Sequence, residues 1–426
     1  MTQLDDYGLE ISTSSAAARD AYAEGVRRFL AADGGIEAVM AEAIAADEAF
    51  ALPHIALARV HQMKGRAADI AAPLAEARKR AAGVTAREQS QIHALGLLME
   101  GKPAEGYAAV RAHLSEYPRD VMIAQTCMGV FSLIGFSGRR GRDAEQLAFT
   151  TSLAPYLGED WWFQSQHAFA LLEVGRTAEA EPFIENSLQT APRSANGAHI
   201  RSHLYYENGE SSAGLKYIDD WRRDYDKDGL LHCHVSWHVA LWALEQGDID
   251  KMWAVLDADV APHGAVAPPI NIMTDTAALL YRAELAGVDV PPERWVKISD
   301  YATQCFPNPG LAFADVHAAL AHAMAGDCEG LEKIVRDAKG PAADIVRRVA
   351  SGFGAIAAQD WSEATAHMTA CIADHERLGG SRAQRDLVEF ALAAALLRQG
   401  KGDEAQRLLV MHRPFSTPQS AIAGLH

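Results

Sequence analysis

The stretch 231–248, LHCHVSWHVALWALEQGD, contains the pattern on which the rest of the chain is built. It predicts a helix that starts near Cys233 and stops at Gly247, because glycine directly after a run of helix-forming residues ends a helix. On that helix His234 and His238 are four residues apart, so both imidazoles lie on one face, one turn above the other. The predicted helix has 14 residues before its glycine, and this length is a ruler for the rest of the chain.

The same 14-residue segment followed by glycine recurs along the chain. The predicted helices are 51–64, 87–100, 161–174, 195–208, 233–246, 273–286, 312–325 and 386–399. In several units a small residue follows five positions after the glycine, and a second amphipathic helix then follows, as in 177–190 and 403–411; the small residues are Gly106, Ala180, Gly214 and Ala405. Small residues allow the two helices of a hairpin to cross closely. This arrangement is typical of the tetratricopeptide repeat of about 34 residues.

Helical hairpins of this kind bury their apolar faces by stacking on their neighbours. The chain contains no Ser/Gly-rich linker, and its largest cluster of helix breakers, 262–269, lies between two repeats. At the N-terminus, Ser12-Thr13-Ser14-Ser15 is a good N-cap cluster for the helical run that follows. We therefore predict an all-α fold, with tetratricopeptide-like hairpins forming a curved superhelix in a single domain, 1–426.

Composition limits the partners and the compartment. The chain has 426 residues, of which 49% are hydrophobic, and a net charge of -17, which argues against nucleic acid or an anionic membrane as the main partner. No apolar run reaches the roughly 18 residues of a membrane span, and the acidic start MTQLDDYGLE is not a signal peptide. The five cysteines are scattered without a CxxC motif, which indicates free thiols and a cytoplasmic location.

A second pair of histidines lies one hairpin before the first, in ANGAHIRSHLYYENG (195–209). The first helices of tetratricopeptide hairpins line the concave face of the superhelix, so the inner faces of adjacent repeats adjoin. From their helical phase we expect six polar side chains to converge on one hollow: His199, His203, His234, His238, Asp275 and His317.

Three interpretations of this set remain open. The histidines are packing residues that hydrogen bond between repeats, or they form a metal-free site for acid–base chemistry or ligand binding, or the two HxxxH pairs bind zinc. The pairs lack the glutamate of an HExxH motif. We therefore expect no metal and no other cofactor, with zinc as the less favoured alternative.

Two further segments attract attention. GGSRAQRD (379–386) opens a helix that Ser381 can cap, and its free N–H groups are a potential anion site. A structural role is favoured, in which Arg385 and Asp386 pair with each other or with the preceding repeat. FSLIGFSGRRGRD (131–143) contains Arg139, Arg140 and Arg142, and we expect it to be a solvated connection.

Several strings resemble the tetratricopeptide repeat protein 38 family over nearly the whole chain: STSSAAA (12–18), HVSWHVALWALEQGD (234–248), DTAALLYRAELAG (275–287), FADVHAALAHAMAG (313–326), GGSRAQRD (379–386) and RPFSTPQS (413–420). The resemblance implies a helical-repeat fold and no settled chemistry. Its pattern includes the six polar residues above and also Trp237, Arg282, Asp315, Gln384, Arg385 and Asp386. Arg382 departs from the histidine expected in relatives, so a ligating role at that position is in doubt.

Two functions follow as expectations. The first is a concave pocket for a small molecule, with the histidines as acid–base or ligand-binding groups, Asp275 or Asp315 orienting one of them, and hydrolysis or proton transfer as the chemistry. The ligand-binding set is Trp237, Tyr206, Arg282, Asp315, Gln384, Arg385 and Asp386. The alternative is a scaffold that binds a partner peptide in its groove. Self-association of the chain is a further expectation. Because the polar residues are concentrated in the central repeats, we favour the pocket.

Overall fold

The computed structural model describes residues 2–412 and 421–425, and almost all of its regular structure is helical. The helices, in chain order, are α1 (Ala16–Ala31), α2 (Ile36–Ala46), α3 (Leu52–Met63), α4 (Ala71–Arg80), α5 (Ala86–Met99), α6 (Pro103–Glu116), α7 (Val121–Ala124), α8 (Arg142–Leu157), α9 (Trp161–Glu173), α10 (Thr177–Thr190), α11 (Ala195–Glu207), α12 (Ser211–Arg222), α13 (His232–Glu245), α14 (Ile249–Val255), α15 (Pro269–Leu285), α16 (Pro292–Cys305), α17 (Ala312–Ala325), α18 (Cys328–Asp337), α19 (Ala343–Ala357), α20 (Trp361–Thr369), α21 (Arg382–Arg398) and α22 (Gly402–His412). Short helical turns are η1 (Ala67–Asp69), η2 (Ala81–Gly83), η3 (Gln125–Cys127), η4 (Leu256–Val260) and η5 (Ile372–Leu378), and two short strands, β1 (Gln3–Leu4) and β2 (Glu10–Ile11), pair antiparallel. The all-α prediction is confirmed. The segment 413–420, which carries part of the family resemblance, lies outside the described residues.

The hairpins turn where the 14-residue ruler places them. All the glycines that it identified adopt the left-handed backbone conformation, with φ between 71 and 83°. That conformation is open to glycine without steric cost. The ruler misses the α19–α20 hairpin, because Gln359 takes the left-handed position there with φ 58°. Two predicted helices start four residues too late: α15 begins at Pro269 and α21 at Arg382.

The small residues of the second helices lie where helices cross. A methyl group at Gly106 would come within 2.5 Å of the Leu98 side chain on the facing helix of the same hairpin. At Gly214 of α12 it would come within 2.5 Å of the Trp242 ring on α13. Ala180 and Ala405 are completely buried at the equivalent places. The close approach predicted within a hairpin is found at Gly106, whereas Gly214 approaches the first helix of the next repeat.

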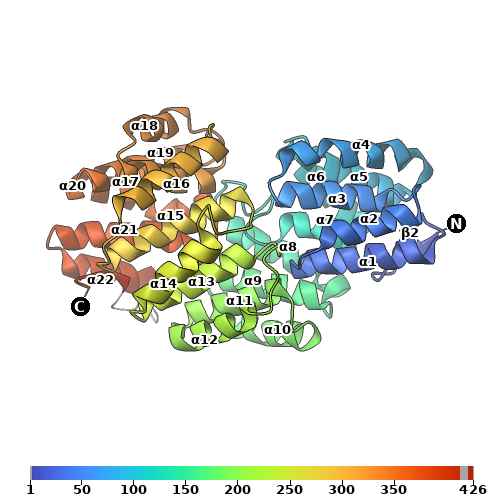
Figure 1. Ribbon diagram of the computed structural model, residues 1–426, viewed down its shortest axis with the longest axis horizontal. Helices are drawn as coiled ribbons and strands as arrows, with labels where there is room; N and C mark the ends of the chain where they lie inside the picture. Colours follow the sequence, from blue (N-terminus) through green and yellow to red (C-terminus); the bar gives the residue numbers. More distant parts are fainter. Residues whose placement is uncertain (1, 413–420, 426) are drawn as a thin grey trace.

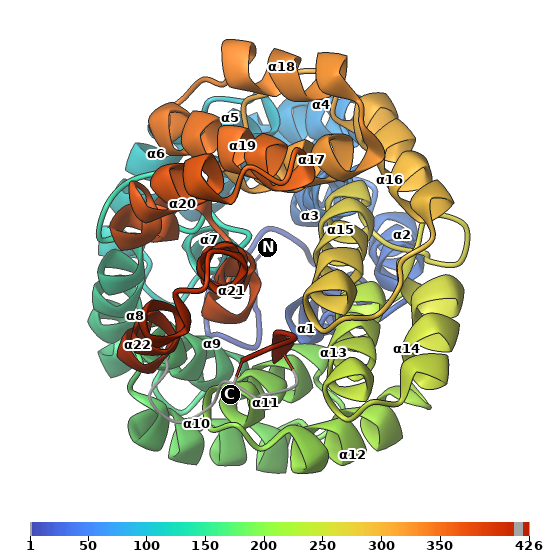
Figure 2. The same ribbon diagram turned by 90° about the vertical axis from the view of Figure 1, so that its left-hand side faces the viewer.

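The stacked hairpins curve into a superhelix whose first and last parts lie at opposite ends of the long axis (Figure 1). Viewed from the end, the helices form a ring, and α21 lies inside it (Figure 2). Helix α21 packs against α11, α15, α20 and η5, and 13 of its 17 residues are buried. The concave face of the central repeats is thus covered by the chain's own C-terminal part.

The segment 131–143 helps to hold α21 in that position. Arg142 is completely buried and donates to the backbone carbonyls of Gly135, Glu376 and Gly380 at 3.1, 2.5 and 2.6 Å. The expectation of a solvated connection holds for the exposed Arg139 and Arg140 but is wrong for Arg142. Periodicity could not reveal this, because two of the three carbonyl partners of Arg142, Glu376 and Gly380, lie more than 200 residues later in the chain.

Buried apolar side chains form two large clusters. One runs from Ile11 to Phe163, and the other combines Ala32 with residues of the central and C-terminal repeats. Leu230, between α12 and α13, packs against both. Among the described residues, none of the helices has both the length and the apolar character that a bilayer span requires.

Candidate functional site

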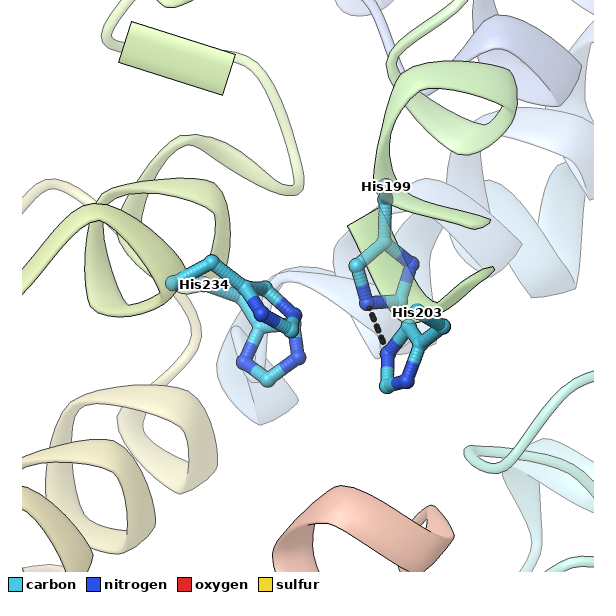
Figure 3. Close-up of side chains that lie close together, drawn as sticks. His199, His203 and His234 are labelled. Atoms are coloured by element: carbon cyan, nitrogen blue, oxygen red, sulfur yellow. Dashed lines mark hydrogen bonds between the residues drawn. The ribbon is translucent and has the colours of Figure 1, made fainter. Parts of the chain in front are cut away.

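The two HxxxH pairs meet between α11 and α13. One ring nitrogen from each of His199, His203, His234 and His238 lies within 4.8 Å of the others, and all four side chains are buried. The ring centroids are 4.9 Å apart for His199 and His234, and 4.9 Å for His203 and His238. Figure 3 shows the rings of the two helices facing each other across the site. We call these four residues the histidine cluster.

Two hydrogen bonds organise the cluster. The Nε2 atoms of His199 and His203 are 2.8 Å apart, so one ring donates to the other (Figure 3). Nδ1 of His234 lies 2.8 Å from Oδ2 of Asp275 on α15, which is itself almost completely buried. A carboxylate only accepts, so His234 donates from Nδ1 and keeps its lone pair on Nε2. Asp275 therefore orients one histidine. The sequence suggests this role for either Asp275 or Asp315.

His238 lies at the most enclosed point of the cluster. It is completely buried, and neither of its ring nitrogens has a hydrogen-bond partner among the described residues. A buried polar group left in that state costs about 1–3 kcal/mol. Trp237 packs beside it and stacks on His234, with ring centroids 5.2 Å apart and planes 9° from parallel. Trp237 thus packs against the rings of both α13 histidines, His234 and His238.

Burial determines the charge of two members of the cluster, His199 and His238. Desolvation, reinforced by the other imidazoles, holds the pKa of His199 and of His238 well below the usual 6.5. Both rings are consequently neutral near pH 7. A neutral imidazole accepts a hydrogen bond, a proton or a metal ion, but it is a poor proton donor.

His317 and Asp315 are expected near the cluster from their positions on the predicted helix, but their side chains make other contacts. Nδ1 of His317 donates to the carbonyl of Phe313 at 2.7 Å, and burial lowers the pKa of this ring to about 4. Asp315 accepts from the backbone N–H of Gly310 at 2.9 Å, and burial raises the pKa of its carboxyl to about 6. Neither residue is among the four whose nitrogens converge.

The remaining polar residues of the predicted site connect α21 to the ring of helices. The Tyr206 hydroxyl on α11 donates to Asp386 at 2.5 Å and accepts from Arg282 on α15 at 3.2 Å. The Arg282 guanidinium also lies over the Phe390 ring, 4.2 Å from its centroid. These contacts join three helices from three different repeats.

The first turn of α21 contacts a carboxyl group that belongs to the chain itself. The backbone N–H of Arg382 donates to Glu173 of α9 at 3.0 Å, and Arg385 pairs with Asp143 of α8 at 2.9 Å. Ser381 caps the helix in a reciprocal arrangement with Gln384. Burial raises the pKa of Glu173 to about 7. Arg385 and Asp386 thus reach across the ring and pair with distant repeats, whereas the sequence suggested each other or the preceding repeat.

A cavity of about 150 Å³ lies beside the cluster, where the two apolar clusters meet. Its wall is mainly apolar and aromatic, and includes His199 and His234. The apolar part is Phe29, Leu30, Ala32, Met63, Met128, Val130, Phe131, Trp162, Phe169, Ile200, Leu230, Leu231 and Pro268, and the other polar side chains are Gln125, Gln166, Asn196, Asn271 and Gln384. No Asp, Glu, Lys or Arg of the described chain lines it.

Sequence reasoning missed most of this wall. Phe29, Met63 and Met128 come from early repeats, whose position beside α11 depends on the full turn of the superhelix. Asn196 and Gln166 lie on predicted helices. The only sequence feature that could have indicated their place in the cavity wall is an amide side chain among positions expected to be buried. Asn271 precedes the predicted start of its helix, so no phase could be assigned to it.

No protein-family model matches the chain. Among solved structures, the chain is similar to the human IFIT1 dimer with m7Gppp-AAAA, at 12% identity over 96% of this chain and 95% of that chain, with a TM-score of 0.46. It is also similar to yeast Tom70 (13% identity, 94% and 84% covered, TM-score 0.36) and to a tetratricopeptide repeat protein from Parabacteroides merdae ATCC 43184 (13% identity, 72% and 98% covered, TM-score 0.32). The fold assignment rests on the hairpins of the chain itself: this is a tetratricopeptide-like helical-repeat protein.

Proposed function

We propose that the protein binds a small, uncharged molecule in the central cavity, with the histidine cluster presenting polar contacts on one wall. The observation that carries the proposal is the composition of the cavity wall, in which aromatic and aliphatic side chains surround His199, His234 and a few amides. Ligand sites of this kind are mostly apolar, with a small number of placed polar groups that fix orientation. A charged ligand would lose its hydration without gaining a counter-charge, which is costly.

The cavity volume limits the size of the ligand. At about 150 Å³ it is comparable to engineered apolar cavities that hold a molecule of about the size of benzene. We therefore infer a compact aromatic or aliphatic ligand with a carbonyl, amide or hydroxyl group that an imidazole or amide can bind.

A proton-transfer reaction is the chemistry that the site would support best. Asp275 fixes the tautomer of His234, so Nε2 is left as the basic nitrogen of a residue that lines the cavity. This is the arrangement in which a carboxylate orients a histidine that acts as a general base. Hydrolysis would require a water molecule positioned by the same ring.

Binding of a partner peptide in the groove is less well supported. Helix α21 occupies the concave side of the central repeats and is fixed there through Asp386 and Arg385. A peptide would have to displace this buried helix or use another surface.

The remaining inferences concern identity and surroundings. We infer membership of the tetratricopeptide repeat protein 38 family from the motifs of the sequence, with RPFSTPQS outside the described residues. The net charge of -17 supports a partner other than nucleic acid or an anionic membrane. None of the five cysteines forms a disulfide, which supports a reducing compartment such as the cytoplasm.

A thermal-shift screen with neutral aromatic, amide and ester compounds tests the proposal. A ligand present at about 100 times its dissociation constant stabilises the protein by about 2.7 kcal/mol, and this stabilisation should be lost in His234→Ala. Leu230→Trp, which places a larger side chain in the cavity wall, should abolish the shift, whereas the buried control His317→Gln should retain it. Equal shifts in the wild type and Leu230→Trp would place the ligand elsewhere and refute the proposal.

A further inference from the structure

We propose that the histidine cluster binds one first-row transition-metal ion, and that the ion fixes α11 to α13. The ligands would be His199 and His203 from α11 and His234 and His238 from α13, each contributing one ring nitrogen. Histidines four residues apart on a helix form half of a zinc site, and here two such halves face each other. The inference shares His199 and His234 with the proposed ligand site, because both also line the cavity, and an ion on Nε2 of His234 would replace the proton-transfer role proposed for that nitrogen.

His238 is the strongest evidence for an ion. It is completely buried and its two ring nitrogens have no hydrogen-bond partner among the described residues, although three other imidazoles surround it. A packing role explains the other members, since His199 bonds to His203 and His234 bonds to Asp275. It does not explain why a polar ring stands at the centre of the group when leucine would fill the same space. A metal ion would supply the missing bond.

Asp275 provides the second part of the evidence. Metal-bound histidines commonly donate their other ring N–H to a carboxylate, which fixes the ring and makes it a better ligand. His234 makes this contact, with 2.8 Å between Nδ1 and Oδ2. The buried carboxylate also supplies negative charge beside the place where a cation would lie.

The donor atoms select the class of metal. Four imidazoles suit zinc, copper, nickel, cobalt and iron, whereas magnesium and calcium require oxygen ligands. Cys233 is next to His234 in sequence, but its Sγ lies 3.8 Å from the Val260 carbonyl and is not one of the converging atoms. A tetrahedral site with four protein ligands is closed, which indicates a structural ion.

Binding would require a small adjustment of the rings. Two nitrogens on a tetrahedral zinc ion, each about 2.0–2.1 Å from it, are about 3.3 Å apart. The His199–His203 contact of 2.8 Å would lengthen toward this value, and the widest separations within the 4.8 Å limit would shorten. Rotations about the side-chain torsions supply such movements without shifting the helices.

The test uses the full chain, stripped of metal with a chelator and then titrated with zinc and with cobalt. We expect about one equivalent of metal by elemental analysis, a rise in Tm, and the visible absorption bands of tetrahedral cobalt. The variant His238→Leu should lower the affinity at least about tenfold. Since leucine removes an unpaired polar ring, the metal-free variant should melt no lower than the metal-free wild type, so loss of metal cannot be attributed to unfolding. The control His317→Gln should bind metal as the wild type does.

A wild type that takes up no stoichiometric metal would overturn the proposal, and so would a His238→Leu variant that binds as tightly as the wild type. Equal loss in His317→Gln would also overturn it, because the effect would then not be specific to the cluster. Leu230→Trp separates this proposal from the cavity proposal, since it reduces the cavity and removes none of the four histidine ligands. Metal binding that survives in Leu230→Trp, with or without a cavity ligand, supports the metal site by itself.

Discussion

At the scale of single residues, helical phase identifies neighbours correctly only over short distances. His199 and His203 are on one helix and His234 and His238 on the next first helix, and their rings meet as predicted. His317 has the same phase as His238 but lies two repeats further on, and its ring turns to the Phe313 carbonyl. Each repeat is rotated relative to the previous one, so positions of equal phase diverge as repeats are added.

The pKa of His317 gives a pH-dependent prediction for stability. Burial lowers this pKa from the usual 6.5 to about 4, so between these values the unfolded chain binds a proton that the folded chain does not. The stability that the neutral ring contributes is complete above pH 6.5 and is lost as the pH falls toward 4. The difference corresponds to roughly 3 kcal/mol.

Calorimetry of the wild type and His317→Gln between pH 7 and pH 4 measures this effect. The difference in Tm between the two proteins should shrink as the pH falls, because glutamine does not titrate. A difference that stays constant over the whole range would show that His317 keeps its ordinary pKa in the folded state.

At the scale of helices, a fixed length of 14 residues before a turn glycine predicts where helices end more reliably than where they begin. The predicted ends of α15 and α21 are within one residue of the observed ones, whereas both helices begin four residues earlier than predicted. Pro269 and the Ser381 cap mark the true starts, since proline is favoured in the first turn and serine before it. A prediction that assumes 14 residues for every helix does not take these local start signals into account.

The glycines of the second helices provide a matched pair of substitutions. In Gly214→Ala the new methyl group would lie 2.5 Å from the Trp242 ring, so α12 must move away from α13. Overpacking of this kind typically costs about 1–3 kcal/mol. In Gly402→Ala the nearest atom is 3.9 Å away, and alanine favours a helix by up to about 1 kcal/mol.

Thermal unfolding should therefore show a lower Tm for Gly214→Ala and an unchanged or higher Tm for Gly402→Ala. If both substitutions stabilised the protein, helix propensity alone would account for their effects. The close crossing of α12 and α13 would then have no energetic role.

At the scale of the whole molecule, a small number of long-range contacts closes the ring around α21. Arg142 donates to the carbonyl of Glu376 in η5 and to that of Gly380 in the turn between η5 and α21. Arg385 and Asp386 continue the connection to α8 and α11. Because these side chains are buried, removal of one leaves polar groups without partners, which is expensive in an apolar interior.

Arg142→Leu should lower the free energy of unfolding by roughly 3 kcal/mol or more, since three buried carbonyls lose their donor. The loss should be local. Hydrogen exchange should accelerate most in 376–386, with little change in α3–α6, which belong to the other apolar cluster. Uniform acceleration along the chain would show instead that the arginine supports the fold as a whole.

The sequence by itself determined the helical repeat, because each turn glycine, small residue and helical period is a local feature, read within about 34 residues. It also determined that two histidine pairs face the concave side, since that follows from phase within adjacent repeats. Only the tertiary structure decided that Asp275 contacts His234, that α21 fills the groove, and that early repeats complete the cavity wall. These depend on the cumulative rotation of many repeats, in which small angles add over the length of the chain and no local pattern records their sum.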